Sequence, residues 1–561
     1  MDQTMTISTL RQGRAILRRA IGKFSGESLL LTALIAITLL RLIDHYRVTS
    51  ATYDESCHVA AGMELLDRGR YTYDIHHPPL ARVMSAFPLY LKGSRSFGLE
   101  NCIEEGNAIL RSSGRPQLNL TLARIGNLLF FFLAAWIVYL WSFRWFSKRT
   151  ALIALVILLN LPPVIGHASL AALDVPGAAG LLTATYTILC WLEKPSTSGW
   201  IWMSLGILLA VLTKFSNIAF LPLTMLAMLV VYSVGRGSAW QDQQVRWKIR
   251  VRQSIASLLL ILLLIPVCYR FYSTTVIPPV GTRQFVSRLF PAESVLHRAS
   301  VRLVETPTPW HPLIAGIYYV DVHNRLGHDG YLLGEFRRHG WWYFFLIVLL
   351  FKTPLGMLMG TPLLVRNWSC RTTFHHSLFC LVAPLLILLF CLSVRINNGV
   401  RHILVLYLFW SIALAHALVV WWDLGGGRQW VVKGLLLLLL SESFLAHPLY
   451  VGHFNLLAAK SPERILADSD LDWGQDLIHL RRYLEEHDLT NVEVVYFGAT
   501  PVDEIIPHRH LRPQPASKEK YLAISLRYLY LENARQGIFK DLLQRPPVAR
   551  IGSSIVLYRI S

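Results

Sequence analysis

The chain has 561 residues, of which 53% are hydrophobic and only 16% are charged. A soluble protein of this length carries more charge and lacks repeated apolar runs of about twenty residues, so this composition indicates a polytopic α-helical membrane protein. The formal net charge is +19, but the residues after 445 carry as many acidic as basic side chains. The basic excess therefore belongs to the membrane part, where it suits anionic lipid or a phosphorylated substrate better than nucleic acid.

Apolar stretches recur along the chain and predict about eleven transmembrane helices. They lie near 28–46, 122–143, 150–168, 173–192, 200–215, 217–234, 254–277, 341–363, 378–394, 401–422 and 430–446. The basic N-terminal segment and the Lys and Arg residues near 144–149, 235–253 and 366–376 fall on one side, which the positive-inside rule makes cytoplasmic. The first stretch is long and lacks a small-residue cleavage site, so we expect it to be retained as a helix.

Three segments on the opposite side are long enough to fold. Residues 47–121 and 278–340 belong to a membrane domain spanning 1–446, and residues 447–561 form a separate extracytoplasmic domain. The first segment includes the apolar amphipathic stretch Leu80–Leu91, which predicts a helix lying along the membrane surface.

The C-terminal tail has the pattern of a small α/β domain. Residues 491–497, 521–526 and 555–560 are rich in β-branched and aromatic side chains, which predicts strands. Residues 476–487 have the apolar spacing of a helix.

Two of the seven cysteines, Cys57 and Cys102, share the first outer segment. That compartment is oxidising under the predicted topology, so a disulfide can form there. Spacing along the chain does not give the geometry, and the pairing stays open at the level of sequence.

An acidic pair, Asp54 and Glu55, follows the first apolar stretch. Charged groups beside a lipid-embedded helix are costly unless they have a partner or a chemical task. One carboxylate can act as a general base toward an acceptor hydroxyl or amine, while its neighbour orients the acceptor or helps to bind a metal. The alternative is that both are interfacial charges where a helix ends.

Further polar residues stand near helix ends on the same side. His76 and His77 precede two prolines that fix a rigid turn, and their imidazoles are suited to a metal or a phosphate, although such histidines are more often part of loop structure. Asp174, two residues before a proline, either caps a helix or supplies a second acid to the site.

Basic side chains also recur at the outward helix ends, where anchoring alone does not require them. They are Arg124, Lys214, Lys352, Arg395, Arg401 and His402. Each by itself is explained by snorkelling to the membrane surface. Several on one face would form a phosphate site, because Arg supplies paired hydrogen bonds to phosphate oxygens.

With these residues the sequence resembles the GT-C class of polyprenyl-phosphate-sugar-dependent glycosyltransferases, in particular the protein O-mannosyltransferases and the lipid A aminoarabinose transferases. The resemblance rests on an ordered set of motifs: Asp54-Glu55, Asp74 to Arg82 with its His-Pro-Pro-Leu core, Lys352 to Gly356, Arg395 to His402, His447 to Tyr450, and Asp470 to Asp476. It implies a GT-C membrane fold and inverting transfer of a sugar from a polyprenyl-phosphate donor to an extracytoplasmic acceptor. It also implies a bacterial inner membrane with the site facing outward.

The resemblance further implies roles for single residues. Asp54 corresponds to the catalytic base, Glu55 to an acid that positions the acceptor, and Arg124 to a contact with the lipid phosphate. Weaker correspondences place Lys352, Arg395 and Arg401 toward the donor. Aminoarabinose transferases carry a Lys before the double proline, and His77 stands there in this chain, which favours a neutral hexose. A divalent metal stays open, because metal dependence varies across the class.

Two rival functions predict other features. Transfer of an oligosaccharide from a lipid pyrophosphate predicts additional acidic metal ligands in the outer loops, and the sequence does not show these clearly. A secondary transporter predicts paired repeats and polar groups at the bilayer midplane, whereas the polar residues here gather at helix ends. The sugar, the acceptor (a protein hydroxyl, a lipid or a glycan) and the oligomeric state are not given by the sequence.

Overall fold

The computed structural model describes residues 26–234, 243–273, 284, 286–292, 294–366, 374–458, 461–512 and 519–560. The basic N-terminal segment before residue 26 lies outside these residues, as do parts of the loops near 235–253, 278–340 and 366–376. The chain divides into two compact units, Met1–Asp44 and His45–Ser561, and the second contains every predicted site residue.

Helices occupy each of the apolar stretches predicted from the sequence. They are α2 (Gly26–Val48), α6 (Pro116–Trp145), α7 (Lys148–Leu158), α8 (Pro162–Ala168), α9 (Asp174–Glu193), α10 (Thr197–Thr213), α11 (Ser216–Val234), α12 (Gln243–Cys268), α16 (Phe344–Lys352), α17 (Leu355–Gly360), α18 (Pro362–Arg366), α19 (Phe374–Cys391), α20 (Leu404–Asp423) and α21 (Gly427–Leu445).

Five helices in the described part of the chain are long and apolar enough to cross a membrane. The number rises to seven if two bent combinations, α7 with α8 and α16 with α17–α18, each count as one span. Several other predicted stretches form shorter apolar helices, among them α10 and α19. These helices support a multi-pass membrane protein, and the total of about eleven spans stays a prediction.

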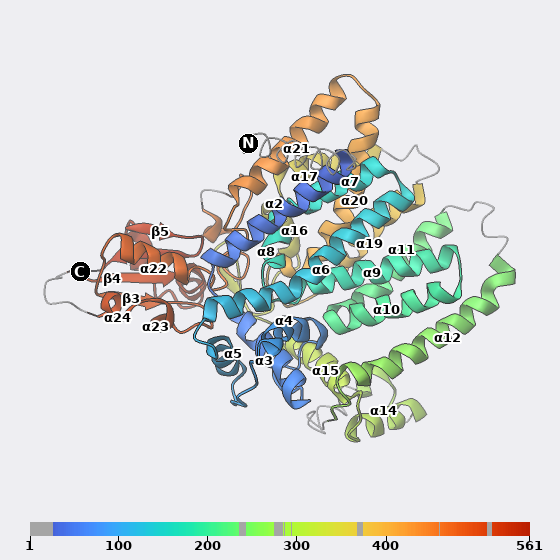
Figure 1. Cartoon of the computed structure of the whole chain (residues 1–561), viewed down its shortest axis with the longest axis horizontal. Helices are drawn as coiled ribbons and strands as arrows, with labels where there is room; N and C mark the ends of the chain where they lie inside the picture. The colour runs from blue at the N-terminus through green and yellow to red at the C-terminus, as the bar shows by residue number, and fades with distance from the viewer. Residues whose placement is uncertain are drawn as a thin grey trace, which may run out of the picture. The chain divides into compact units, whose positions relative to one another are not determined.

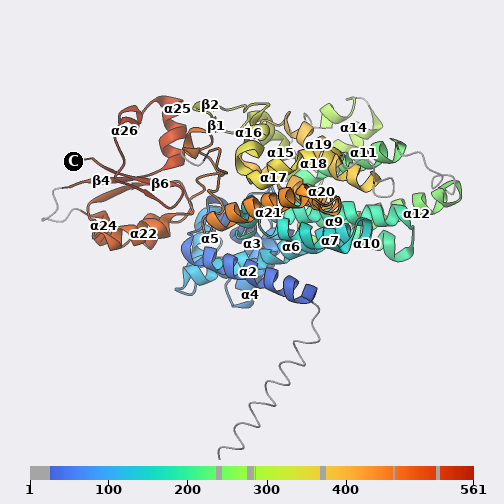
Figure 2. The same ribbon diagram turned by 90° about the horizontal axis from the view of Figure 1, so that it is seen from above.

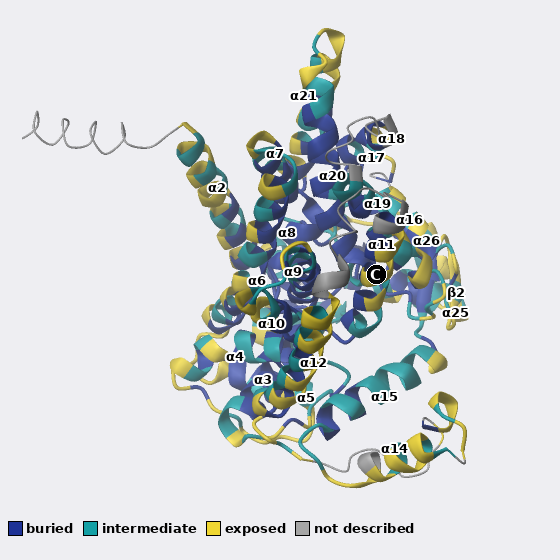
Figure 3. Ribbon diagram, turned by 90° about the vertical axis from the view of Figure 1, so that its right-hand side faces the viewer, coloured by how far each residue is buried: buried dark blue, intermediate teal, exposed yellow. Residues whose placement is uncertain are grey.

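The helix α20 lies in the interior of the second unit (Figure 3). It packs against α7, α9 and α19, and its side chains are buried along most of its length. A helix that is apolar on all sides is expected in such an interior position. The helix α6 also packs against α20, and α10 packs against α9 (Figure 1). Arg124 lies on α6, Asp174 is the first residue of α9, and Lys214 follows the last residue of α10.

Residues 47–121, the first predicted outer segment, contain three helices: α3 (Tyr53–Arg68), α4 (Leu80–Leu91) and α5 (Cys102–Arg111). The predicted helix at Leu80–Leu91 is confirmed, and its position along a membrane surface stays a prediction. Gly62 of α3 lies so close to α4 that an added Cβ would come within 2.0 Å of the carbonyl oxygen of Arg82. Cys57 and Cys102 form a disulfide that joins α3 to α5.

The described part of residues 278–340 includes the helices α14 and α15 and a short hairpin. These are α14 (Val295–Glu305), α15 (His311–Leu326), β1 (Gly330–Leu332) and β2 (Glu335–Arg337), the strands being antiparallel. A short 3-10 helix, η2 (Val400–Ile403), leads into α20 and carries two of the predicted cations, Arg401 and His402.

The tail forms a four-stranded sheet in the order β3-β4-β6-β5. Its strands are β3 (Val492–Val495), β4 (Tyr521–Ser525), β5 (Ala549–Ile551) and β6 (Ile555–Arg559), with β3 parallel to β4 and the other pairs antiparallel. The associated helices are η3 (Pro462–Arg464), α22 (Leu477–Glu486), α23 (Val502–Ile505), α24 (His508–Leu511), η4 (Tyr528–Glu532), α25 (Asn533–Gln536) and α26 (Lys540–Gln544).

The helices α22 and α24 lie along one side of this sheet, and α25 and α26 lie along the other (Figure 2). Buried leucines of α22, Leu477, Leu480 and Leu484, pack against Val492 and Leu557. The three predicted strands and the predicted helix are confirmed. The strand β5 escaped prediction because it is only three residues long and includes a charged side chain.

Candidate active site

The first turn of α3 sends its two acidic side chains in different directions. Successive residues of an α-helix are rotated by about 100° around its axis, because one turn takes 3.6 residues. Asp54 is partly exposed, whereas Glu55 is fully buried. The adjacent carboxylates therefore have separate partners, and each is described with its own.

Asp54 forms an ion pair with Arg401 of η2, and Arg401 Nη1 donates to Asp54 Oδ2 at 2.7 Å. The side chains are 29% and 14% exposed respectively, so the pair lies at the edge of the protein interior. The guanidinium carbon of Arg401 lies 4.5 Å from the ring centroid of Trp473, a cation–π contact. The structure thus brings together one predicted acid and one predicted cation that are 347 positions apart in the chain.

Glu55 and Arg124 form a second ion pair, in which both side chains are 0% exposed. Arg124 donates through Nε to Oε1 at 2.8 Å and through Nη2 to Oε2 at 2.9 Å. The backbone amides of Ala171 and Thr52 each donate to the same carboxylate at 2.8 Å. Burial would raise the pKa of Glu55, but Arg124 and these hydrogen bonds outweigh burial and hold it below the ordinary value.

The remaining donors of Arg124 also have partners within the protein. Nη1 donates to Thr49 Oγ1 at 3.0 Å, and Nη2 donates to the carbonyl oxygen of Ser50 at 2.8 Å. Arg124 therefore binds the segment that precedes α3, together with the acid in its first turn. No part of its side chain is exposed in this arrangement.

Residues of the tail also contact the beginning of α3. The amide of Tyr53 donates to the carbonyl oxygen of Trp473, and the amide of Ser50 donates to that of Gln475, both at 2.9 Å. Ser50 Oγ also donates to the carbonyl oxygen of Gly474 at 3.0 Å. The turn around residues 473–475 is thus joined to the start of α3 through the backbone.

The three acids of the Asp470 to Asp476 motif hold this turn in place. Asp470 Oδ1 accepts from the amide of Val400, immediately before Arg401, at 2.8 Å. Asp472 accepts from the amide of Arg527 at 2.9 Å, and burial raises the pKa of Asp472 to about 7. Asp476 accepts from the amides and hydroxyls of Ser553 and Ser554 at 2.8–2.9 Å.

Asp174 and Lys214 form a third ion pair, which contacts the backbone of Arg401. Lys214 Nζ donates to Asp174 Oδ1 at 2.7 Å and to the carbonyl oxygen of Arg401 at 3.2 Å. His167 Nδ1 lies 3.6 Å from Asp174 Oδ2. The N-cap of α9 is Leu173 and Asp174 is the first residue of the helix, so Asp174 is not the capping residue, and Lys214 is its nearest described side-chain partner.

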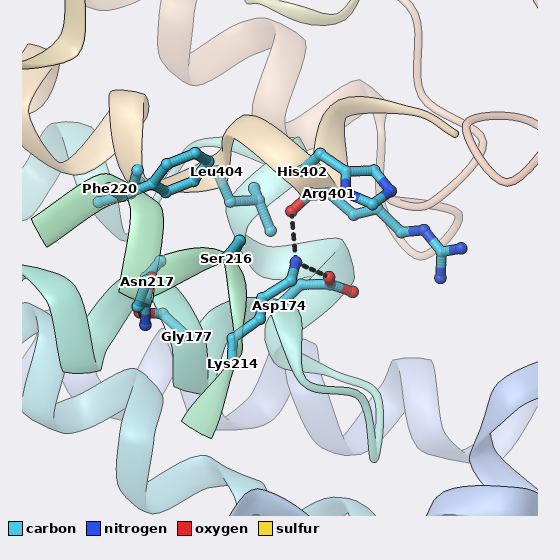
Figure 4. A pocket seen from close by; sticks show the side chains of 11 residues that line it. Asp174, Gly177, Lys214, Ser216, Asn217, Phe220, Arg401, His402 and Leu404 are labelled. Atoms are coloured by element: carbon cyan, nitrogen blue, oxygen red, sulfur yellow. Dashed lines mark hydrogen bonds and ion pairs between the residues drawn. The ribbon is translucent and has the colours of Figure 1, made fainter. Parts of the chain in front are cut away.

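Asp174, Lys214 and Arg401 line a small pocket between η2, α9, α11 and α20 (Figure 4). The pocket also includes Asn217, Phe220, His402 and Leu404. In Figure 4 the Lys214 ammonium lies between Asp174 and the Arg401 backbone, while the guanidinium of Arg401 points away from Phe220 and Leu404. Arg401 therefore faces Asp54 with its side chain and the pocket with its backbone.

The histidine motif builds a turn rather than a set of free ligands. Asp74, at a positive φ of 44°, forms an ion pair with Arg82 and lies 2.9 Å from His76 Nδ1. Arg82 is fully buried, and its Nη1 also donates to the carbonyl oxygen of Asp74 at 2.7 Å. The pKa of Asp74 is well below its ordinary value: burial opposes this shift, but Arg82 and His76 outweigh burial. Burial holds the pKa of His77 well below its ordinary value.

Two other predicted cations do not join this group. Lys352 is buried and donates to the carbonyl oxygens of Val451 at 2.9 Å and Asp470 at 2.6 Å, so it ties the tail to α16. Arg395 is exposed, and its Nη1 reaches only the carbonyl oxygen of Arg325 at 3.5 Å.

The structure adds residues that the sequence did not single out. Trp473 and His167 contact Arg401 and Asp174 respectively, and their rings lie 5.8 Å apart. Trp473 lies within the Asp470 to Asp476 motif, which could have indicated it, whereas nothing in the local sequence marked His167. Among the described residues, no group of three or more His, Cys, Asp or Glu side chains is arranged to hold a metal ion.

A family model matches part of the chain. Residues 67–276 match the family described as dolichyl-phosphate-mannose-protein mannosyltransferase. The matched range includes Arg124, Asp174 and Lys214, while Asp54 and Arg401 lie outside it. The resemblance to polyprenyl-phosphate-dependent glycosyltransferases predicted from the motifs is confirmed by this match.

Solved structures provide two further comparisons. ArnT from Cupriavidus metallidurans bound to undecaprenyl phosphate is 14% identical, with 94% of this chain and 97% of that chain covered and a TM-score of 0.49. The archaeal oligosaccharyltransferase AglB from Archaeoglobus fulgidus, in complex with an inhibitory peptide and a dolichol-phosphate, is 14% identical, with 74% of this chain and 56% of that chain covered and a TM-score of 0.41. A search of curated proteins gives no match.

Proposed function

We propose that this chain is a membrane glycosyltransferase that moves a sugar from a polyprenyl-phosphate donor to an extracytoplasmic hydroxyl, with inversion at the sugar carbon. The observation that carries the proposal is the contact between Asp54 and Arg401 at a partly exposed position. Such a pair offers both groups that the reaction needs, a base for the acceptor and a cation for the phosphate. The family match to residues 67–276 supports the donor class.

In the proposed reaction the acceptor hydroxyl gives its proton to the carboxylate of Asp54. The acceptor oxygen forms a bond to the anomeric carbon while the bond from that carbon to the phosphate oxygen breaks. The electron pair of the broken bond remains on the polyprenyl phosphate, whose added negative charge is stabilised by Arg401. Attack opposite to the leaving phosphate inverts the configuration at the anomeric carbon.

The buried pair of Glu55 and Arg124 has a supporting role in this proposal. Both side chains are fully enclosed and fully engaged with each other and with the backbone around residues 49–52 and 171. The sequence placed Glu55 toward the acceptor and Arg124 toward the lipid phosphate. We propose instead that the pair fixes the first turn of α3 and so determines where Asp54 lies.

A purified sample should consume a polyprenyl-phosphate sugar. The measurement is incubation with a series of radiolabelled polyprenyl-phosphate monosaccharides, followed by counting of released lipid phosphate and labelled acceptor. Neutral hexoses are expected to be better donors than an aminosugar, following His77. The second candidate, transfer of an oligosaccharide, is supported if only a lipid-pyrophosphate oligosaccharide is consumed, and turnover of neither donor type would exclude both candidates.

We further propose that residues 447–561 are an extracytoplasmic domain and that the protein resides in a bacterial inner membrane. The balance of acidic and basic residues in the tail supports this, because it lacks the basic excess of a cytoplasmic segment. Alkaline phosphatase fused to the C-terminus, after residue 561, should be active, and a fluorescent protein that matures only in the cytoplasm should not fluoresce when fused at the same position. The reverse pattern would place the tail and the site on the cytoplasmic side.

A further inference from the structure

Arg401 contacts the proposed base directly and is also the proposed phosphate-binding cation. Its Nη1 donates to Asp54 Oδ2 at 2.7 Å, and its Nε donates to the carbonyl oxygen of Asn398 at 3.2 Å. Among the described residues, Arg401 is the only side chain that forms an ion pair with Asp54. The proposed base and the proposed phosphate-binding cation are bound to each other in this structure.

This arrangement conflicts with both proposed tasks at once. A guanidinium binds phosphate most strongly through two parallel N–H groups, and the Asp54 carboxylate takes one of those positions on the Nη1 side. In the same way, Asp54 Oδ2 accepts from Arg401, so one oxygen of the proposed base is directed at the cation instead of at an acceptor hydroxyl. A paired contact between Arg401 and the phosphate through Nη1 would therefore replace the contact with Asp54.

The surroundings allow Arg401 to remain in place during such an exchange. Trp473 holds the guanidinium by a cation–π contact that does not depend on Asp54. The amide of Val400, next to Arg401 in the chain, is fixed by Asp470. The side chains of Asp54 and Arg401 are both partly exposed, so an anion can reach Arg401 from the solvent.

We propose that Asp54 and the donor phosphate compete for Arg401, so that donor binding releases the Asp54 carboxylate for the acceptor. This inference rests on the proposed function and adds an order to it: the lipid phosphate binds first and the base becomes available afterwards. Because competition for one group is reciprocal in free energy, removing the Asp54 charge should strengthen phosphate binding.

The test compares binding of undecaprenyl phosphate to the full-length protein and to Asp54→Asn in lipid nanodiscs. The variant should bind at least about 5-fold more tightly than the unmodified chain, the lower end of ordinary coupling between two sites. Undecaprenol, which lacks the phosphate, should bind both proteins equally. A variant that binds the phosphate lipid equally or more weakly overturns the exchange.

Two further variants separate this effect from a general loss of charge. Asp67→Asn removes a carboxylate from the same helix, where Asp67 lies 3.5 Å from Arg95, and it should leave the affinity unchanged. Arg401→Gln should weaken phosphate binding and cancel the gain when combined with Asp54→Asn. Equal gains in Asp54→Asn and Asp67→Asn would mean that only net charge matters. If no variant binds the phosphate lipid better than undecaprenol, the proposed donor class fails along with the exchange.

Discussion

Replacing Asp54 with Asn should lower turnover by about 10²–10⁴-fold while the protein remains folded. The substitution keeps the size and shape of the side chain but removes its capacity to accept a proton. The phosphate is already a good leaving group, so the reaction depends chiefly on the base and on charge at the phosphate. Turnover is measured with saturating donor, so that a change in donor affinity does not obscure the loss of the base.

The matched control for this substitution is Asp67→Asn. Asp67 lies on the same helix and is 22% exposed beside Arg95, so its replacement makes the same chemical change away from the site. Turnover of the control should match that of the unmodified protein. A well-folded Asp54→Asn protein with full turnover would remove Asp54 from the mechanism, and equal losses in both variants would point to an effect of charge on the outer segment.

Replacing Glu55 with Gln should destabilise the protein strongly, by about 3–5 kcal/mol, the usual result when one partner of a buried ion pair is removed. The change leaves Arg124 with an uncompensated charge at a position with no exposure. It also weakens the acceptors offered to the amides of Thr52 and Ala171, which fix the beginning of α3. The measurement is the midpoint of thermal unfolding in detergent, followed by the yield of monodisperse protein.

The comparison variant is Asp423→Asn, which breaks the ion pair between Asp423 and Arg149. Those side chains are 54% and 56% exposed, and an exposed pair contributes only about 0–1 kcal/mol. Its unfolding midpoint should be almost unchanged. If Glu55→Gln unfolds at the same temperature as the unmodified protein but loses turnover, Glu55 acts on the acceptor, as the sequence suggested, and the supporting role is wrong.

The sequence predicted the helices and strands better than it predicted which side chains contact each other. Apolar runs and alternating β-branched residues depend on local order, and they located helices such as α4 and α22 and the strands β3, β4 and β6. The bends that divide α7 from α8 and α16 from α17 were not predicted, because each apolar run continues through the break.

In the candidate site, the sequence likewise identified residues but not the contacts between them. The sequence singled out both Asp54 and Arg401, yet their contact could not be predicted because it joins residues 347 positions apart. It treated Asp54 and Glu55 as one pair, whereas the rotation between successive helical residues gives them different surroundings. Lys352 looked like a donor-binding cation, but a charge count cannot reveal that two backbone carbonyl oxygens already bind it.

The backbone bonds between α3 and the turn around Trp473 have a consequence for biosynthesis. Ribosomes make the chain in order, so α3 and its carboxylates emerge long before the carbonyl oxygens of Trp473 and Gln475 that bind the amides of Tyr53 and Ser50. The apolar helices have been synthesised by the time the turn arrives. Under the proposed function, a nascent chain therefore holds Asp54 and Arg401 before the centre is complete, and it consumes lipid donor only after residues 473–475 have joined α3.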